Sequence, residues 1–390
     1  MPAYIGVNGK AKQIYKVYQG NSEGKAEMIY APKGVYKYEK EISPLSVARS
    51  ELVAESTENK AVFAGGYDGT NRLNTVDAYD ANLTHTTYSP MNLALTGMAI
   101  GTVGTTKANR KIYIMGGSDG TNCTNTGTVY DDNGTKTAST SMSVARKYAS
   151  AATTSYGSTS RIHIAGGIGT DGYTLNSVER FSSSGTRTNA SNLSAAKTYM
   201  GASWCNDCVI FAGGWGKNSS GSYYYSTVDS YKKTTSTRTK LDNLTNGRYD
   251  ICGIYTYFVG ALAKHIDHHY ALFAGGYRNK EYFTDVDVYN SYQVHTVLST
   301  GLSIGRCRMS AAQIGEYVMF FGGYYYNSDQ SSYYRTSTID VFDSNLSRIT
   351  MALPESQYYN AATEVGNYAL VAGGTGSTKI STVNAYYVWE

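Results

Sequence analysis

The stretch AVFAGG at residues 61–66 determines how the whole chain is interpreted, because close copies of it recur six more times. The copies are KIYIMGG (111–117), RIHIAGG (161–167), VIFAGG (209–214), ALFAGG (271–276), VMFFGG (318–323) and ALVAGG (369–374). Successive glycine pairs are separated by 51, 50, 47, 62, 47 and 51 residues, a period typical of a repeat fold. Each apolar run is near-continuous, which indicates a strand covered on both faces.

Other positions repeat with the glycine pairs. A Leu or Met precedes each pair, at Leu45, Leu93, Met142, Leu193, Leu244, Leu302 and Leu353. An aromatic residue follows each pair, at Tyr79, Tyr130, Phe181, Tyr231, Tyr289, Phe342 and Tyr386. This aromatic residue lies near the end of an alternating stretch such as TVDAYD (75–80), which predicts a further strand with one face buried. Asp68, Asp119 and Asp171 stand in Gly/Asn/Ser-rich clusters that predict hairpin turns.

Four short strands in a unit of about 50 residues resemble the blade of a kelch-type β-propeller, as in the central domain of galactose oxidase. The resemblance covers roughly residues 35–390 and implies an all-β, seven-bladed kelch-type propeller. One kelch feature is missing: the Trp that usually follows the third-strand aromatic is replaced by polar residues such as His85, Lys136, Arg187 and His295.

The chain stops four residues after Tyr386, which leaves the seventh unit without a fourth strand. VYKYEKE at residues 35–41 precedes Leu45 much as other fourth strands precede the next unit. We therefore expect this N-terminal strand to close the ring. The predicted domains are a small β module at residues 1–33 and the propeller at residues 34–390.

Charge is concentrated at the N-terminus. Seven lysines and three glutamates lie in the first 40 residues and account for the whole net charge of +4. The remaining residues are neutral overall, which argues against nucleic-acid binding. The hydrophobic content of 41% in seven units is ample for a core without disulfides.

The sequence shows no apolar run long enough for a membrane span and no signal-peptide hydrophobic region. Five scattered cysteines do not form a disulfide framework, and favour folding in a reducing compartment. Only 16% of residues are charged while 38 are Tyr, a composition often found in exposed adhesins and virion proteins. We therefore expect a protein made in the host cytoplasm, without a signal peptide, and assembled into a phage virion.

Residues 1–33 contain two imperfect copies of one motif, YIGVNGKAKQIYK (4–16) and YQGNSEGKAEMIY (18–30). Each copy predicts two short strands joined by a Gly-Lys-Ala turn. The segment resembles GVNGKA-type leaders on structural proteins of phages that infect Gram-positive bacteria. The resemblance implies attachment to other virion proteins, and the alternative is an ordered N-terminal arm.

Basic and acidic residues recur together in five units. The bases four residues after the Leu or Met position are Arg49, Arg146, Lys197, Arg248 and Arg306. The acids shortly before the aromatic are Asp77, Glu179, Asp229, Asp287 and Asp340. Units two and seven lose both members, with Gly97 and Thr128 in one and Gln357 and Asn384 in the other. Joint loss favours a structural ion pair over a basic ring for anionic ligands, because a lone buried charge costs several kcal/mol.

Two loops that join second to third strands are long and rich in aromatic residues: WGKNSSGSYYYST (215–227) and YYYNSDQSSYYRTST (324–338). The predicted binding residues are Trp215, Tyr223, Tyr224, Tyr225, Tyr324, Tyr325, Tyr326, Tyr333, Tyr334 and Arg335. In an up-and-down blade both loops flank one mouth of the central channel. Tyr and Trp suit carbohydrate or protein surfaces, and the alternative is that these residues only extend two hairpins.

Unit five carries an insertion with the sequence HIDHH, in which His265, Asp267, His268 and His269 could bind a metal. A single cluster of this kind is usually polar surface, so we expect no metal and no other cofactor. Cys205 and Cys208 fall at a two-residue turn and are interpreted as cross-strand thiols.

No catalytic constellation is evident, since the turn aspartates lack partners for a two-carboxylate mechanism. The predicted function is a non-enzymatic phage structural protein, such as a tail tip, fibre or decoration, present in multiple copies per particle. Its propeller would bind host-surface glycan or protein, without nucleic acid or membrane insertion. The alternatives are an enzyme resembling galactose oxidase or acting on polysaccharide, and a scaffold that contacts only virion proteins.

Overall fold

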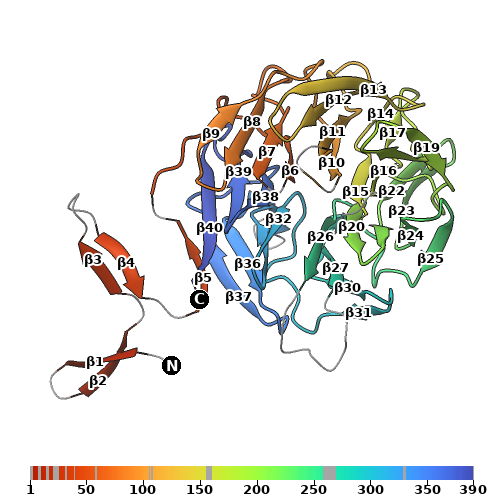
Figure 1. The fold of residues 1–390 in the computed structure, drawn as a ribbon. Helices are drawn as coiled ribbons and strands as arrows, with labels where there is room; N and C mark the ends of the chain where they lie inside the picture. Colours follow the sequence, from red (N-terminus) through yellow and green to blue (C-terminus); the bar gives the residue numbers. More distant parts are fainter. Residues whose placement is uncertain are drawn as a thin grey trace.

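The computed structural model describes residues 3–389, except 8–9, 15–16, 21–25, 31–32, 39, 58, 105, 107–108, 155–159, 258–268 and 328–330. The described residues form strands and connecting loops, without a helix. Seven four-stranded antiparallel sheets are arranged as the blades of a β-propeller (Figure 1). The predicted all-β, seven-bladed architecture is thus confirmed.

Each blade has four strands, ordered from the channel outward. The first strands are β6 (Val53–Ser56), β10 (Ala99–Val103), β15 (Ser150–Thr153), β20 (Gly201–Cys205), β26 (Cys252–Tyr257), β32 (Ser310–Ile314) and β38 (Ala361–Val365). The second are β7 (Lys60–Ala64), β11 (Lys111–Met115), β16 (Arg161–Ala165), β21 (Cys208–Ala212), β27 (His269–Ala274), β33 (Tyr317–Phe321) and β39 (Tyr368–Ala372). The first strands contact one another in a closed ring, which places them around the channel.

The third strands are β8 (Val76–Asp80), β12 (Thr126–Asp131), β18 (Val178–Ser182), β24 (Val228–Lys232), β30 (Val286–Asn290), β36 (Thr338–Phe342) and β40 (Val383–Trp389). The outer strands are β9 (His85–Thr87), β13 (Lys136–Ser141), β19 (Arg187–Ala190), β25 (Arg238–Leu241), β31 (His295–Val297), β37 (Arg348–Ala352) and β5 (Gly34–Lys37). The last of these comes from the N-terminal part of the chain.

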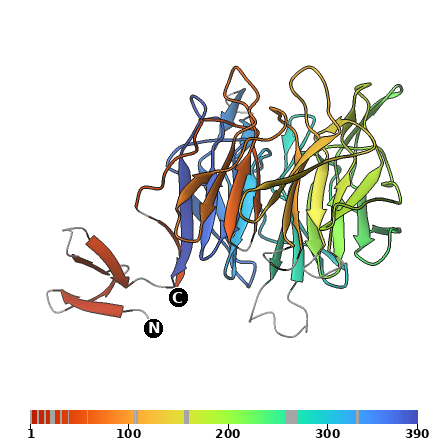
Figure 2. The ribbon, with the colours of Figure 1, turned by 45° about the horizontal axis from the view of Figure 1, so that its top comes forward.

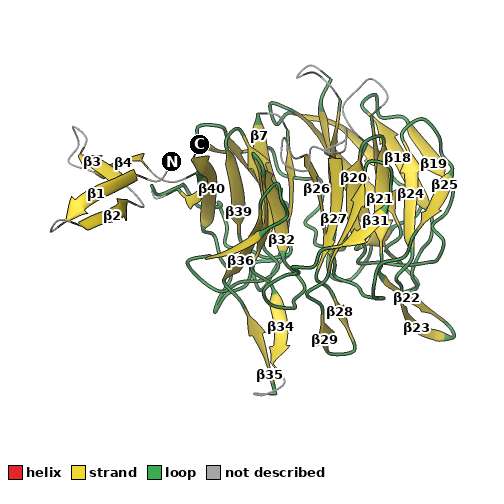
Figure 3. Ribbon diagram, turned by 90° about the horizontal axis from the view of Figure 1, so that it is seen from below, coloured by secondary structure: helices red, strands yellow, loops and turns green. Residues whose placement is uncertain are grey.

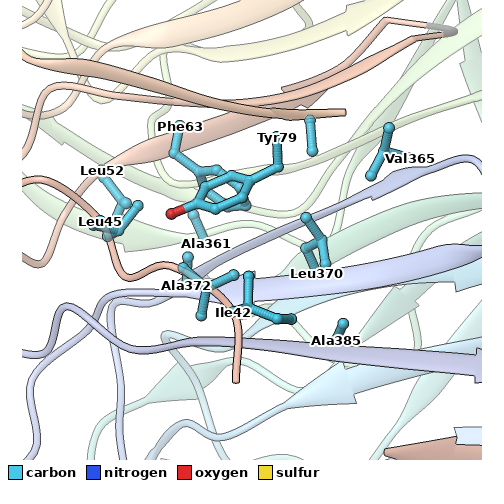
Figure 4. Close-up of a cluster of buried hydrophobic side chains, with 12 residues drawn as sticks. Ile42, Leu45, Leu52, Phe63, Tyr79, Ala361, Val365, Leu370, Ala372 and Ala385 are labelled. Atoms are coloured by element: carbon cyan, nitrogen blue, oxygen red, sulfur yellow. The ribbon is translucent and has the colours of Figure 1, made fainter. Parts of the chain in front are cut away.

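The ring closes as the sequence predicts, because β5 pairs antiparallel with β40 and supplies the fourth strand of blade 7. Val35 lies opposite Val388, and the Tyr38 N–H donates to the Ala385 carbonyl at 2.8 Å. A buried cluster then joins blade 7 to blade 1, and it includes Leu45 and Phe63 from blade 1 and Leu370 from blade 7 (Figure 4). Equivalent clusters fill the other six interfaces between blades.

The glycine pairs end the second strands and join neighbouring blades. Both glycines of every pair have positive φ. A Cβ on Gly66, where φ is 111°, would lie 2.7 Å from the Ser50 carbonyl oxygen, so a larger residue does not fit. The second glycine of each pair donates its N–H to the next blade, as from Gly66 to Leu95 and from Gly374 to Arg49.

Residues before β5 form two hairpins outside the seven sheets. They pair β1 (Ala3–Val7) with β2 (Lys10–Ile14), and β3 (Val17–Gly20) with β4 (Ala26–Tyr30). Figures 1 and 2 show both hairpins beside the ring. Within the described residues, nothing helical could serve as a membrane span.

Three loops between second and third strands form hairpins of their own. They pair β22 (Trp215–Asn218) with β23 (Gly221–Tyr224), β28 (Tyr277–Arg278) with β29 (Glu281–Tyr282), and β34 (Tyr324–Asn327) with β35 (Ser332–Arg335). Figure 3 shows all three projecting from one face of the ring, which we call the hairpin face. In blade 3, β14 (Arg146–Lys147), which precedes the first strand, pairs with β17 (Ile168–Gly169) at the start of the loop between second and third strands.

Candidate functional site

The five bases and five acids that recur in the sequence meet within their own blades. The pairs are Arg49 Nη2 to Asp77 Oδ2 at 2.7 Å, Arg146 Nη2 to Glu179 Oε1 at 2.9 Å, Lys197 Nζ to Asp229 Oδ2 at 3.0 Å, Arg248 Nη2 to Asp287 Oδ2 at 2.5 Å, and Arg306 Nη1 to Asp340 Oδ2 at 2.6 Å. All ten side chains are buried. Their burial leaves them out of contact with any ligand in solution.

Each of these acids also meets a second, partly exposed basic side chain from the outer strand. His85 Nε2 lies 2.7 Å from Asp77, and His295 Nε2 lies 2.7 Å from Asp287. Arg187, Arg238 and Arg348 make the matching contacts in blades 3, 4 and 6, at 3.3 to 3.6 Å. In these five blades, the outer-strand position where kelch blades usually have a Trp therefore holds a basic residue. This residue contacts the buried acid, as the buried base also does. Lys136, in a blade without the pair, donates to Asn92 Oδ1 at 3.1 Å.

In blade 2 the repeated positions before the glycine pair lie two residues earlier in the chain than the sequence predicted. The predicted apolar position, Leu93, is 42% exposed, whereas Met91 is buried. The carbonyl that accepts the Gly66 N–H belongs to Leu95, and the corresponding acceptors in five other blades belong to the ion-pair bases. Leu95, and not Gly97, thus occupies the position of the base. Three apolar residues at alternate positions, 91, 93 and 95, made the alignment ambiguous in the sequence.

The predicted binding residues lie on two of the hairpins. In β22–β23, Trp215 is opposite Tyr224, and Tyr225 follows the hairpin. In β34–β35, Tyr326 is opposite Tyr333 and Tyr325 is opposite Tyr334. The ring of Tyr333 contacts those of Tyr324 and Tyr326 on one side of the hairpin, where Arg335 is also placed by the register. Tyr223 and Tyr333 are the most exposed aromatic residues of the group, at 41% and 49%.

Seven residues line the channel at the hairpin face, two positions after each base position, and the sequence had singled out only Gly97 among them, at the base position of blade 2. These mouth residues are Glu51, Gly97, Tyr148, Tyr199, Asp250, Arg308 and Tyr359. Six are not glycine, yet all seven have φ between 52° and 65°. Left-handed backbone costs a non-glycine residue about 1–2 kcal/mol, so the surrounding fold must hold it. In the sequence these residues could have been found only by their constant distance from the base position, because they share no residue type.

The mouth residues are linked to one another and to the loops beside them. Backbone hydrogen bonds run from Tyr148 to Gly97, from Asp250 to Tyr199, from Tyr359 to Arg308, and from Glu51 to Tyr359, at 2.7 to 3.1 Å. The residue before each mouth residue forms a β-bridge to the start of the loop between the second and third strands of the same blade, as between Cys307 and Tyr324. The mouth and the hairpins therefore form one surface.

A cavity of about 230 Å³ opens at this mouth. Six of the mouth residues, all but Glu51, line it. Met98, Met200, Ile251 and Met309, each one residue further along the chain, also contribute to its lining. The cavity therefore combines aromatic rings, apolar side chains and one pair of opposite charges.

That charge pair is Arg308 with Asp250. Arg308 Nε lies 3.5 Å from Asp250 Oδ2. Burial raises the pKa of Asp250 above its ordinary value, although the Arg308 guanidinium opposes this shift. The Arg308 guanidinium also lies over the rings of Tyr359 and Tyr324, at 4.8 and 5.3 Å from their centroids. Asp250 and two aromatic rings thus hold the cation in place.

An aromatic band connects the mouth to the hairpins. Tyr148 stacks on Tyr199 at 4.8 Å, and Tyr199 contacts Tyr249 at 6.0 Å. Tyr249 in turn contacts Tyr224 of β23 and Tyr277 of β28. On the other side, Tyr358 contacts both Tyr359 and Tyr324. Rings from five blades therefore form two connected groups around one opening.

The far end of the channel has a different character. Trp204 stacks on Tyr255 at 3.6 Å, and the Tyr255 hydroxyl lies 2.7 Å from His269 Nδ1. Of the proposed metal ligands only His269 is described, while His265, Asp267 and His268 lie outside the described residues. Across the part of the chain that is described, no three His, Cys, Asp or Glu side chains gather as a metal site would require. Cys205 and Cys208 face each other as thiols across the turn at 206–207.

Two carboxyl groups line the channel. Burial is the main cause that raises the pKa of Glu55 to about 8; a hydrogen bond from the Ser56 backbone opposes the shift, and the nearby Glu364 adds to it. The pKa of Glu364 is also raised, to about 7. Its side chain has an exposed surface, but the protein around it removes much of the water that would stabilise the charged form. Glu55 borders a small cavity of about 70 Å³ with Thr102, Thr153 and Trp204.

Comparison with known proteins shows the fold alone. The chain resembles a solved structure titled "Structure of YjhT", with a TM-score of 0.54 and 11% sequence identity. The match covers 90% of this chain and 99% of that one, and YjhT is also a propeller. No family model matches the chain, and no curated protein matches it either.

Proposed function

We propose that this chain is a kelch-type propeller that binds carbohydrate on a host cell surface through its hairpin face, as a non-enzymatic structural protein of a phage particle. The observation that carries the proposal is the aromatic surface formed by the mouth residues and the tyrosine-rich hairpins. Tyrosine and tryptophan offer large, rigid contact areas with a polar tip, and their rings stack on the faces of sugars. The exposed rings of Tyr223 and Tyr333 would make the first contacts.

Attachment to the particle is assigned to residues 1–33. The two hairpins β1–β2 and β3–β4 are separate from the propeller sheets, and the net positive charge of the chain lies in the first 40 residues. A tail tip, a fibre or a head decoration would each present the propeller outward in multiple copies. Purified chain should decorate particles that lack this protein, and chain without residues 1–33 should not.

An enzyme is the alternative. A copper centre of the kind implied by the resemblance to galactose oxidase requires two His beside its Tyr ligands. The four described histidines are dispersed: His85 and His295 contact buried acids, His163 is buried in β16, and His269 meets Tyr255. This dispersal of the described histidines argues against such a copper centre.

A glycan array probed with the full-length chain tests the proposal. We expect binding that falls about tenfold or more in Tyr223→Ala or Tyr333→Ala, the size of loss typical of a central aromatic contact. Tyr292→Ala is the matched control, because Tyr292 is 67% exposed in a turn between third and outer strands, away from the hairpins. Turnover of a bound sugar would favour the enzyme instead. Decoration of particles without any glycan binding would favour the scaffold.

A further inference from the structure

We propose that the cavity at the channel mouth binds the oxyanion of an acidic carbohydrate, and that Arg308 is the residue that recognises it. This inference rests on the proposed carbohydrate-binding function and specifies the class of ligand. The oxyanion is a carboxylate or a phosphate carried by a sugar or polyol unit.

Arg308 has a fixed position at the mouth. Its backbone has φ 56°, in the left-handed region, and its guanidinium lies over Tyr359 and Tyr324. A cation held over aromatic faces keeps its charge while its orientation is restricted. Arg308 is therefore positioned before any ligand arrives.

Arg308 also retains unused hydrogen-bond donors. Its described charged partner, Asp250, lies on the Nε side at 3.5 Å, and no described residue accepts a hydrogen bond from the two terminal nitrogens. The Arg308 side chain is 32% exposed and that of Asp250 only 12%. A planar guanidinium fork with free donors matches the two oxygens of a carboxylate or phosphate.

The shape and chemistry of the cavity limit the size of the ligand. Its volume of about 230 Å³ is smaller than the roughly 300–1,000 Å³ of pockets for drug-sized ligands, and suits a single sugar or polyol unit. Tyr148, Tyr199 and Tyr359 supply rings and hydroxyl groups beside the cation. Apolar methionine side chains complete the lining. The cavity holds the Asp250 carboxylate as well as the Arg308 guanidinium, but Arg308 is the more exposed of the two, at 32% against 12%. This difference favours a sugar unit with one negative charge over a neutral sugar.

The experiment uses the full-length chain and matched probes on one array. Oligogalacturonate is paired with neutral oligogalactose, and poly(glycerol phosphate) is paired with glycerol. We expect at least one acid to bind about tenfold more tightly than its uncharged partner, consistent with a charged hydrogen bond. The carboxylate and phosphate arms identify which oxyanion is preferred.

Variants then test the role of Arg308. Arg308→Gln should abolish the preference for the acid, and Arg308→Lys should retain part of it, because the charge remains without the planar fork. Lys240→Gln removes an exposed charge from β25 and should leave the preference unchanged. Because Arg308→Gln leaves Asp250 without its partner, Arg308→Gln/Asp250→Asn serves as the second variant, and melting temperatures show whether each variant folds.

Acid binding that survives in the folded Arg308→Gln/Asp250→Asn variant would overturn the inference, and so would equal binding of acids and neutral partners. If neutral glycans bind and depend on Tyr223 and Tyr333, the anion site is wrong while the proposed function stands. If no carbohydrate of either kind binds, both are wrong.

Discussion

Arg248 and Asp287 form an ion pair that is completely buried, and the pair is completed by backbone groups and by His295. Arg248 donates to the carbonyls of Gly275 and Asn246 at 2.6 and 3.2 Å, while Thr245 N–H donates to Asp287 Oδ1 at 3.0 Å. Burial alone would raise the pKa of Asp287, but Arg248 and these hydrogen bonds lower it below its ordinary value. The pair therefore fixes the start of blade 5 to its second and third strands.

Removal of this arginine tests the structural role of the pair. Arg248→Ala leaves the buried Asp287 carboxylate without its main partner, and should lower the free energy of unfolding by about 3–5 kcal/mol. Arg278→Ala is the control, because its pair with Glu281 is partly exposed and is expected to contribute at most about 1 kcal/mol. Urea denaturation of both variants gives the comparison. Unchanged stability in Arg248→Ala would rule out the structural role.

Blade 2 offers a way to remove both charges together. There Leu95 takes the place of the base, and Thr128 Oγ1 accepts the Asn92 N–H at 3.1 Å in place of the acid. Arg248→Leu/Asp287→Thr copies this arrangement into blade 5 and leaves neither member of the buried pair charged without its partner. The double variant should therefore be more stable than either single variant, as a double-mutant cycle measures. A double variant less stable than both single variants would contradict this explanation of the joint loss.

Ring closure can be tested by truncation. Removal of residues 1–32 deletes only the two N-terminal hairpins and should leave the melting temperature of the propeller unchanged. Removal of residues 1–38 also deletes β5, exposes the edge of β40 and uncovers the cluster that contains Val35. This shorter chain should melt at a lower temperature or aggregate through the exposed edge. Equal melting of the two chains would show that β5 does not close the ring.

The channel carboxyls predict how stability depends on pH. The folded-state pKa of Glu55 is raised to about 8, so between its ordinary value and pH 8 the folded chain holds a proton that the unfolded chain has lost. Stability from this group is therefore complete at low pH and decreases as pH rises through that range, by at most about 1.4 kcal/mol per pH unit. Glu55→Gln should flatten the profile between pH 5 and about 8. A profile identical to that of the parent chain would contradict the assignment.

The sequence was sufficient for the fold but not for the whole candidate site. Glycine pairs and ion-pair positions carry a residue type, so their period is visible, and Arg49 and Asp77 meet as their spacing suggests. The mouth residues share only a backbone conformation, since Glu51, Gly97 and Arg308 have no side-chain property in common. The second role of His85 and His295 was also hidden, because the resemblance to kelch blades led us to expect a Trp there.

The most direct test of carbohydrate binding at the hairpin face is hydrogen–deuterium exchange of the full-length chain with and without a glycan that it binds. We predict slower exchange in residues 215–224 and 324–335 and at the mouth residues, with no change in the turn at residues 291–294. Protection of that turn, or of the far end of the channel instead of the hairpins, would show that the hairpin face is not the binding surface.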